Sequence, residues 1–93
     1  MAFRFDVSEE VEQVMAGLKR RDPRCYETVK KKMLEIASRD PTTIDFYKNL
    51  RHGLSDYKRV HVCGRLVLMF KVLKKENHIH FERLKHHDEA YGP

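Results

Sequence analysis

The sequence predicts an α+β fold in which helices pack on one face of a mostly antiparallel sheet. Three observations support this prediction: a short alternating apolar segment begins the chain, two amphipathic segments with helix-start signals follow it, and three alternating segments separated by turn residues come last. Because helices and strands are segregated along the sequence, they are expected to form separate layers around one core. The expected order is β-α-α-β-β-β, with the first strand beside a three-stranded antiparallel meander.

The first strand and the first helix are predicted from the residues between Phe3 and Lys19. Apolar and polar residues alternate over Phe3–Val7, which is the period of a half-buried strand. Ser8 is suited to cap the helix that follows, and acidic residues in its first turn favour the helix dipole. Apolar residues then recur at i, i+3, i+4 and i+7: Val11, Val14, Met15 and Leu18. The first helix is therefore expected from about Ser8 to Lys19.

The second helix has its own start signal in Asp22-Pro23, because Asp caps helices and Pro fits the first helical turn. Apolar residues follow at every third or fourth position: Tyr26, Val29, Met33, Ile36 and Ala37. This helix is expected to end near Ser38. The very short turn before it predicts that both helices form a hairpin with one shared apolar face.

The rest of the chain is predicted to be a long connection followed by strands. A polar connection of about fifteen residues begins at Asp40-Pro41, and apolar residues anchor it: Ile44, Phe46, Tyr47 and Leu50. Alternating segments then predict three antiparallel strands, with turns at Gly64 and at 74–77: Tyr57–Cys63, Arg65–Leu73 and Ile79–Leu84.

Length and charge narrow the class of protein. The 93 residues, 35% of them charged, predict one globular domain over residues 1–93. Residues 1–47 hold nine Lys/Arg and nine Asp/Glu, whereas residues 48–93 hold ten Lys/Arg, five Asp/Glu and all six histidines. Since phosphates attract clustered cations, this asymmetry favours a nucleic-acid partner.

No segment approaches the roughly 18 apolar residues of a membrane span, and the start lacks the apolar run of a signal peptide. The protein is therefore expected in the cytoplasm, without a membrane partner. Cys25 and Cys63 form no CxxC pair and are too few for a disulfide scaffold. They are expected to be reduced, partly buried thiols.

Three stretches in the last forty residues resemble the RelE/ParE toxin superfamily. They are Leu54–Val62, Gly64–Val72 and the ending His86–Gly92, which are similar to the family's second strand, third strand and C-terminal signature. Their order and spacing, after a helical hairpin, support this resemblance. Within the family, the His-His-Asp-x-x-Tyr ending looks most like that of a RelE-type mRNA interferase of a type II toxin–antitoxin system. The resemblance covers nearly the whole chain.

The resemblance implies a ribosome-dependent endoribonuclease that cleaves mRNA in the ribosomal A site and inhibits translation. In that reaction the 2′-hydroxyl attacks the adjacent phosphate, and no metal or cofactor is needed. The implied partners are the ribosome with its mRNA and an acidic, RelB-like antitoxin, in a heterotetramer of two toxins and an antitoxin dimer. Two alternatives remain open: a ParE-like gyrase inhibitor and a catalytically inactive binding protein of the same fold.

The central strands supply the first candidate site residues. Arg65 matches the family's arginine at the third strand, and a guanidinium can bind two phosphate oxygens of the transition state. If Val60 and Val62 face the helices, one face carries Tyr57, Arg59 and His61. Arg59 and His61 are then candidates for phosphate binding and proton transfer, and Tyr57 for RNA contact. If the opposite face of this strand is the exposed one, Lys58 would take their place as an RNA-binding residue.

The C-terminal segment supplies the others. His86 and His87 lie where related toxins carry a basic residue or a histidine, and an imidazole can act as general acid or base at neutral pH. The sequence favours His87 slightly without separating the two. Tyr91 matches the family's C-terminal tyrosine, and Lys85 and Arg83 add positive charge for RNA binding.

Two questions stay open at the sequence level. The carboxylates Glu82 and Glu89 match no catalytic glutamate clearly, so the general acid and the general base are not assigned. A metal site is the rival explanation for one group of residues: His78, His80, His86, His87 and Asp88. The resemblance argues against metal, so none is predicted.

Overall fold

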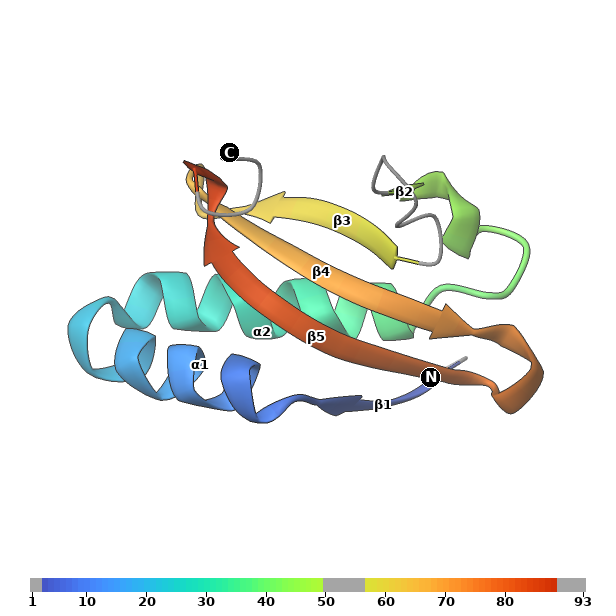
Figure 1. Cartoon of the computed structure of the whole chain (residues 1–93), viewed down its shortest axis with the longest axis horizontal. Coiled ribbons are helices and arrows are strands. Elements are labelled where there is room, and N and C mark those ends of the chain that lie inside the picture. The colour runs from blue at the N-terminus through green and yellow to red at the C-terminus, as the bar shows by residue number, and fades with distance from the viewer. Residues whose placement is uncertain (1–2, 50–56, 89–93) are drawn as a thin grey trace.

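The computed structural model describes residues 3–49 and 57–88 and has two layers, a helical hairpin and a mixed sheet (Figure 1). Within the described residues the sheet has five strands in the order β1-β5-β4-β3-β2. Along the chain the elements are β1 (Arg4–Val7), α1 (Glu9–Arg21), α2 (Pro23–Ala37), the short 3-10 helix η1 (Ile44–Phe46), β2 (Lys48–Asn49), β3 (Tyr57–Val62), β4 (Leu66–Leu73), the 3-10 helix η2 (Lys74–Glu76) and β5 (His78–His86).

The predicted α+β order is confirmed, and the sheet is more mixed than a meander alone. Strands β3, β4 and β5 pair antiparallel in sequence order, whereas β1 pairs with β5 in parallel. The short β2, which pairs with β3, was not predicted, because two residues carry no periodicity. Strand β4 begins at Leu66 instead of Arg65, since residues 63–65 form the turn. The predicted anchor Leu50 lies outside the described residues.

Local capping explains where the two helices begin. The Ser8 hydroxyl accepts a hydrogen bond from the Val11 amide at 3.1 Å, and the Asp22 carboxylate accepts one from the Cys25 amide at 3.3 Å. Asp22 also ends α1, because its own amide donates to the Leu18 carbonyl at 2.7 Å. A single residue therefore separates the helices and fixes them side by side.

The core lies between the helical hairpin and one face of the sheet. Residues that are fully or almost fully buried come from both layers: Val11, Val29, Ile36, Leu68, Phe70, Ile79, Phe81 and Leu84. Val11, Val29 and Ile36 belong to the apolar positions predicted for the two helices, and burial of apolar area drives the two layers together. Among the described residues, no helix covers the opposite face of the sheet (Figure 1).

The expectation of two reduced thiols is wrong, because Cys25 and Cys63 form a disulfide with their Cα atoms 5.8 Å apart. Cys25 lies in the first turn of α2, and Cys63 lies in the turn between β3 and β4. Their separation of 38 residues hides this proximity at the sequence level. The packing of α2 across the sheet brings them together.

In the part of the chain that the structure describes, no helix combines the length and the apolar character needed to cross a membrane.

Candidate active site

The face of the sheet opposite the helices carries a basic surface on β3, β4 and β5. Three rows of directly opposed residues cross it: Tyr57, Lys71 and His80; Arg59, Met69 and Arg83; and His61, Val67 and Lys85. The register therefore confirms that Tyr57, Arg59 and His61 share a face, with Val62 in the core. Val67 and Met69 lie at the centre of this surface and are buried, flanked by longer basic side chains.

Lys71 was not among the predicted site residues, although it belongs to this surface. Its Nζ lies 5.9 Å from the centre of the Tyr57 ring, within the range of a cation–π contact. The alternation within β4 was the available signal, because Lys71 shares a face with Val67 and Met69.

Two histidines from distant segments meet at the end of this surface. The rings of His61 in β3 and His87, just after β5, stack with centroids 5.2 Å apart and planes 29° apart. The His87 amide donates to the Arg65 carbonyl at 2.7 Å, which ties the chain after β5 to the turn between β3 and β4. Figure 1 shows this junction at the end of the sheet that lies nearest the turn between α1 and α2.

The adjacent His86 lies on the other side of the sheet. It pairs with Leu66 across β4, and Leu66 belongs to the core, so His86 points toward the helix layer. Its Nδ1 accepts a hydrogen bond from the Asp88 amide at 3.3 Å. The structure thus separates two histidines that the sequence could not, and it places only one of them beside His61.

Arg65 stands in the turn that meets this histidine pair. The turn contains Cys63 with φ 55° and Gly64 with φ 75°, and glycine adopts that left-handed conformation without strain. The Arg65 Nη2 lies 3.8 Å from the Asp22 Oδ2, and the two side chains are 62% and 42% exposed. An exposed pair of this length contributes roughly 0–1 kcal/mol, so it leaves the guanidinium able to bind a phosphate.

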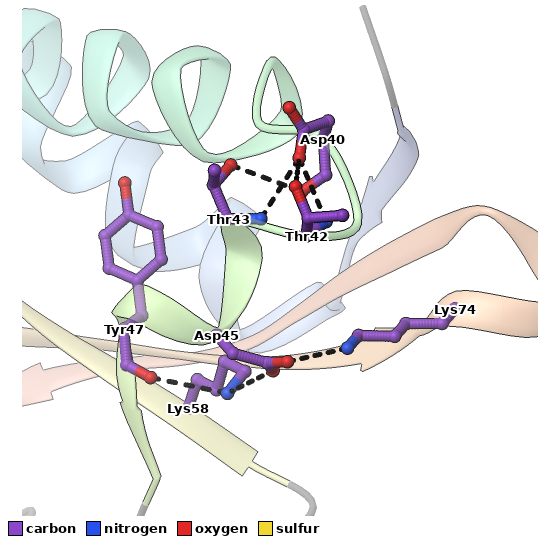
Figure 2. Close-up of polar contacts among 7 residues, drawn as sticks. All are labelled: Asp40, Thr42, Thr43, Asp45, Tyr47, Lys58 and Lys74. Carbon is purple, nitrogen blue, oxygen red and sulfur yellow. Dashed lines mark hydrogen bonds and ion pairs between the residues drawn. The ribbon is translucent and has the colours of Figure 1, made fainter.

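The expectation that Lys58 contacts RNA is corrected by its burial. Alternation places it on the face opposite Arg59, and only 7% of the residue is exposed. Its Nζ donates to the Tyr47 carbonyl at 3.3 Å and pairs with the Asp45 carboxylate at 3.2 Å (Figure 2). Lys58 therefore fastens the connection around η1 to the sheet.

Asp45 links two lysines in this network, because its other oxygen accepts from the Lys74 Nζ at 2.7 Å (Figure 2). Hydrogen bonds from Lys74 and then Lys58 lower the pKa of the Asp45 carboxyl below its usual value. A second carboxylate, that of Asp40, accepts from Thr42 and Thr43 and orders the turn before η1. The network is structural and lies at the opposite end of β3 from His61.

The candidate ligands of the rival metal site lie at two places along β5 and the residues after it. The Nδ1 atoms of His86 and His87 lie 3.7 and 3.9 Å from the Asp88 carboxylate, whereas His78 and His80 lie farther along β5 and contact the Asp6 carboxylate at 2.6 and 3.0 Å. Hydrogen bonds from His78 and then His80 lower the pKa of Asp6. Among residues 3–49 and 57–88, no group of three or more His, Cys, Asp or Glu side chains is arranged to hold a metal ion. The predicted Tyr91, like Glu89, falls outside the described residues.

Solved toxin structures share this fold. A metal-bound toxin from Helicobacter pylori superposes with a TM-score of 0.75 at 23% identity, covering 96% of this chain and 99% of that one. A mutant of the E. coli toxin RelE, in complex with a peptide of the antitoxin RelB, superposes with a TM-score of 0.67 at 20% identity, covering 92% and 84%.

Sequence comparison gives the family. No family model matches the chain. A curated relative from Methanocaldococcus jannaschii, named "Putative toxin RelE4", is 34% identical over 89 residues, which are 96% of this chain and 90% of the relative. That identity over nearly full length, together with the shared fold, shows that the chain belongs to the RelE family of toxins.

Proposed function

We propose that this protein is a ribosome-dependent mRNA endonuclease, the toxin of a type II toxin–antitoxin system, and that it cleaves mRNA in the ribosomal A site. The observation that carries the proposal is the stacking of His61 on His87 beside the turn of Arg65, at the end of a basic sheet face. The membership of the RelE family supports it.

The two imidazoles meet the needs of the chemistry. The 2′-oxygen attacks the neighbouring phosphorus and loses its proton, while the 5′-oxygen leaves and gains one. An imidazole can accept or donate a proton in such a reaction. His61 and His87 together would supply one acceptor and one donor at the same place.

The reaction also needs fixed positive charge to stabilise its transition state. The guanidinium of Arg65 would stabilise the extra negative charge of the transition state, by exchanging its weak pairing with Asp22 for phosphate oxygens. Arg59, Arg83 and Lys85 lie in the adjacent rows and would hold the flanking phosphates. Tyr57, at the start of β3, would stack on a base farther along the strand, and Tyr91 remains a predicted catalytic residue.

An antitoxin is the proposed cellular partner. The related RelE toxin has been solved with an antitoxin peptide, and the basic face here is suited to an acidic, RelB-like chain. Such a chain would cover the phosphate-binding residues and silence the toxin. The proposed assembly is a heterotetramer of two toxins and an antitoxin dimer in the cytoplasm, with the ribosome as the target after the antitoxin is removed.

Primer extension on an mRNA under translation tests the function. Cuts in phase with codons, present with ribosomes and absent on free mRNA, are expected from the wild-type protein. A His87→Ala variant should lose them, whereas His86→Ala, altered one residue away on the opposite face, should keep them. Intact mRNA at all protein concentrations would reject the nuclease, and inhibition of DNA gyrase in the same preparation would favour a ParE-like activity.

A further inference from the structure

The disulfide between Cys25 and Cys63 lies at the candidate active site. Cys63 is in the same three-residue turn as Arg65 and is two residues from His61. At its other end, the Cys25 amide donates to the Asp22 carboxylate, which in turn faces Arg65. The bond thus joins the first turn of α2 to the turn that carries the proposed phosphate-binding arginine.

The turn between β3 and β4 contacts two neighbouring segments, α2 and the segment after β5. The turn is joined to α2 by the disulfide and by the pairing of Arg65 with Asp22, which is long and exposed. It is joined to the segment after β5 by the hydrogen bond from the His87 amide to the Arg65 carbonyl. Because an exposed ion pair is weak, the covalent bond holds the turn to α2 more strongly than the pairing of Arg65 with Asp22 does.

We propose that the Cys25–Cys63 disulfide is a reversible redox clamp that positions the turn between β3 and β4. Oxidation holds this turn against α2 and keeps Arg65 and the His61–His87 pair in register. Reduction releases the turn and lowers the rate of RNA cleavage. The second statement rests on the proposed nuclease function, whereas the first concerns the chain alone.

The exposure of the two sulfur-bearing residues indicates how the clamp opens. Cys25 is 5% exposed, whereas Cys63 is partly buried. An external thiolate would attack the Cys63 sulfur and form a mixed disulfide, releasing Cys25 as a thiolate that takes up a proton. A second external thiolate then attacks the sulfur of the first and releases Cys63 as a thiolate that takes up a proton, so two small thiols become one disulfide and both cysteines become thiols. A small-molecule disulfide such as oxidised glutathione runs the exchange backwards.

Histidine NMR signals test the clamp without any measurement of cleavage. The protein is compared after treatment with dithiothreitol and after oxidation, with alkylation and mass measurement to count free thiols. Reduction is expected to free two thiols, to shift the ring signals of His61 and His87, and to leave those of His78 and His80 in place. His78 and His80 contact Asp6 at the start of β5, the end of that strand away from His87, and serve as internal controls.

Three outcomes would overturn the clamp. These are the absence of a bond in oxidised protein, unchanged signals of His61 and His87 on reduction, and equal shifts at all four histidines. The last would mean that the bond stabilises the whole fold instead of one turn. A Cys25→Ala, Cys63→Ala double variant should give the spectrum of reduced protein under both conditions, and its circular dichroism checks that it is folded.

Cleavage kinetics then test the consequence for activity. On translated mRNA, reduction should lower kcat on the order of 10-fold or more, since small misplacements of catalytic groups cost up to roughly 10²-fold. KM should change little, because the flanking residues Arg59 and Arg83 remain on their strands. The double alanine variant should not respond to dithiothreitol. If neither redox form cuts mRNA, the nuclease proposal fails, and the histidine signals still decide the clamp.

Discussion

The rings of His61 and His87 stack with their centroids 5.2 Å apart, although one belongs to β3 and the other follows β5. Strand β4 lies between β3 and β5, so the contact reaches across the end of a strand. The hydrogen bond from the His87 amide to the Arg65 carbonyl closes the same corner. Two titratable rings held in contact are expected to act as a unit.

Single and double alanine substitutions at these histidines measure how far the two rings depend on each other in cleavage. His61→Ala and His87→Ala should each lower kcat by about 10²–10⁴-fold, the usual contribution of a general acid or base. The double variant should be little slower than the worse single variant, because groups that act together are strongly non-additive. Rates from primer extension give the comparison, with His86→Ala as the control. If the fold-loss of kcat in the double variant equals the product of the two single losses, the rings act independently.

The meeting of these residues was only partly accessible from the sequence. Period-two alternation places Tyr57, Arg59 and His61 on one face, because that periodicity is local. Choosing between His86 and His87 requires the register of β5 on β4, in which Leu66 opposes His86. That register includes an irregularity between Met69 and Phe70, which no local pattern indicates.

Local sequence patterns predict local contacts well and distant contacts poorly. Ser8 and Asp22 cap their helices as predicted, since capping involves residues three positions away. Lys58 has the appearance of a surface cation, and its burial depends on Asp45 and the Tyr47 carbonyl arriving from a connection without regular periodicity. The pairing of Cys25 with Cys63 likewise depends on how α2 crosses the sheet. Long-range packing therefore decides both the burial of Lys58 and the pairing of the two cysteines.

Arg65 is expected to act in the transition state. Arg65→Ala should lower kcat by about 10²-fold or more, the scale found when a charge-stabilising group is removed. Arg65→Lys should recover part of this loss, because a lysine keeps the charge and loses the two-pronged geometry. Lys75→Ala, an exposed cation in η2 at the far end of the sheet, is the matched control and should leave kcat unchanged. Near-normal cleavage by Arg65→Ala would remove this residue from the mechanism.

Neighbouring cations on β3 should have opposite effects. Lys58→Met removes the donor to the Tyr47 carbonyl and should lower the free energy of unfolding by about 1 kcal/mol, while cleavage stays intact. Arg59→Ala leaves the contacts of Lys58 with Tyr47 and Asp45 in place, so the η1 connection should stay fastened to the sheet. The same substitution should weaken RNA binding and reduce the salt dependence of the affinity by about one phosphate contact. Urea unfolding and binding titrations at several salt concentrations separate the two effects. Weaker RNA binding by Lys58→Met with unchanged binding by Arg59→Ala would contradict the roles given to the two faces of β3.

Asp6 should make the stability of the sheet edge depend on pH. Its carboxylate accepts from His78 and His80 on β5, and these hydrogen bonds hold the pKa of Asp6 below its usual 3.8. A carboxyl with a lowered folded-state pKa stabilises the fold at pH values above the unfolded-state pKa, and that stabilisation is lost as the pH falls through the lowered value. Asp6→Asn should therefore be less stable than wild type at neutral pH. The difference should shrink as the pH falls below about 4. Urea unfolding of both proteins along a pH series gives the measurement, with Glu27→Gln, an exposed acid on α2, as the control. A stability difference that is the same at neutral and acid pH would mean that the Asp6 charge does not hold β1 to β5.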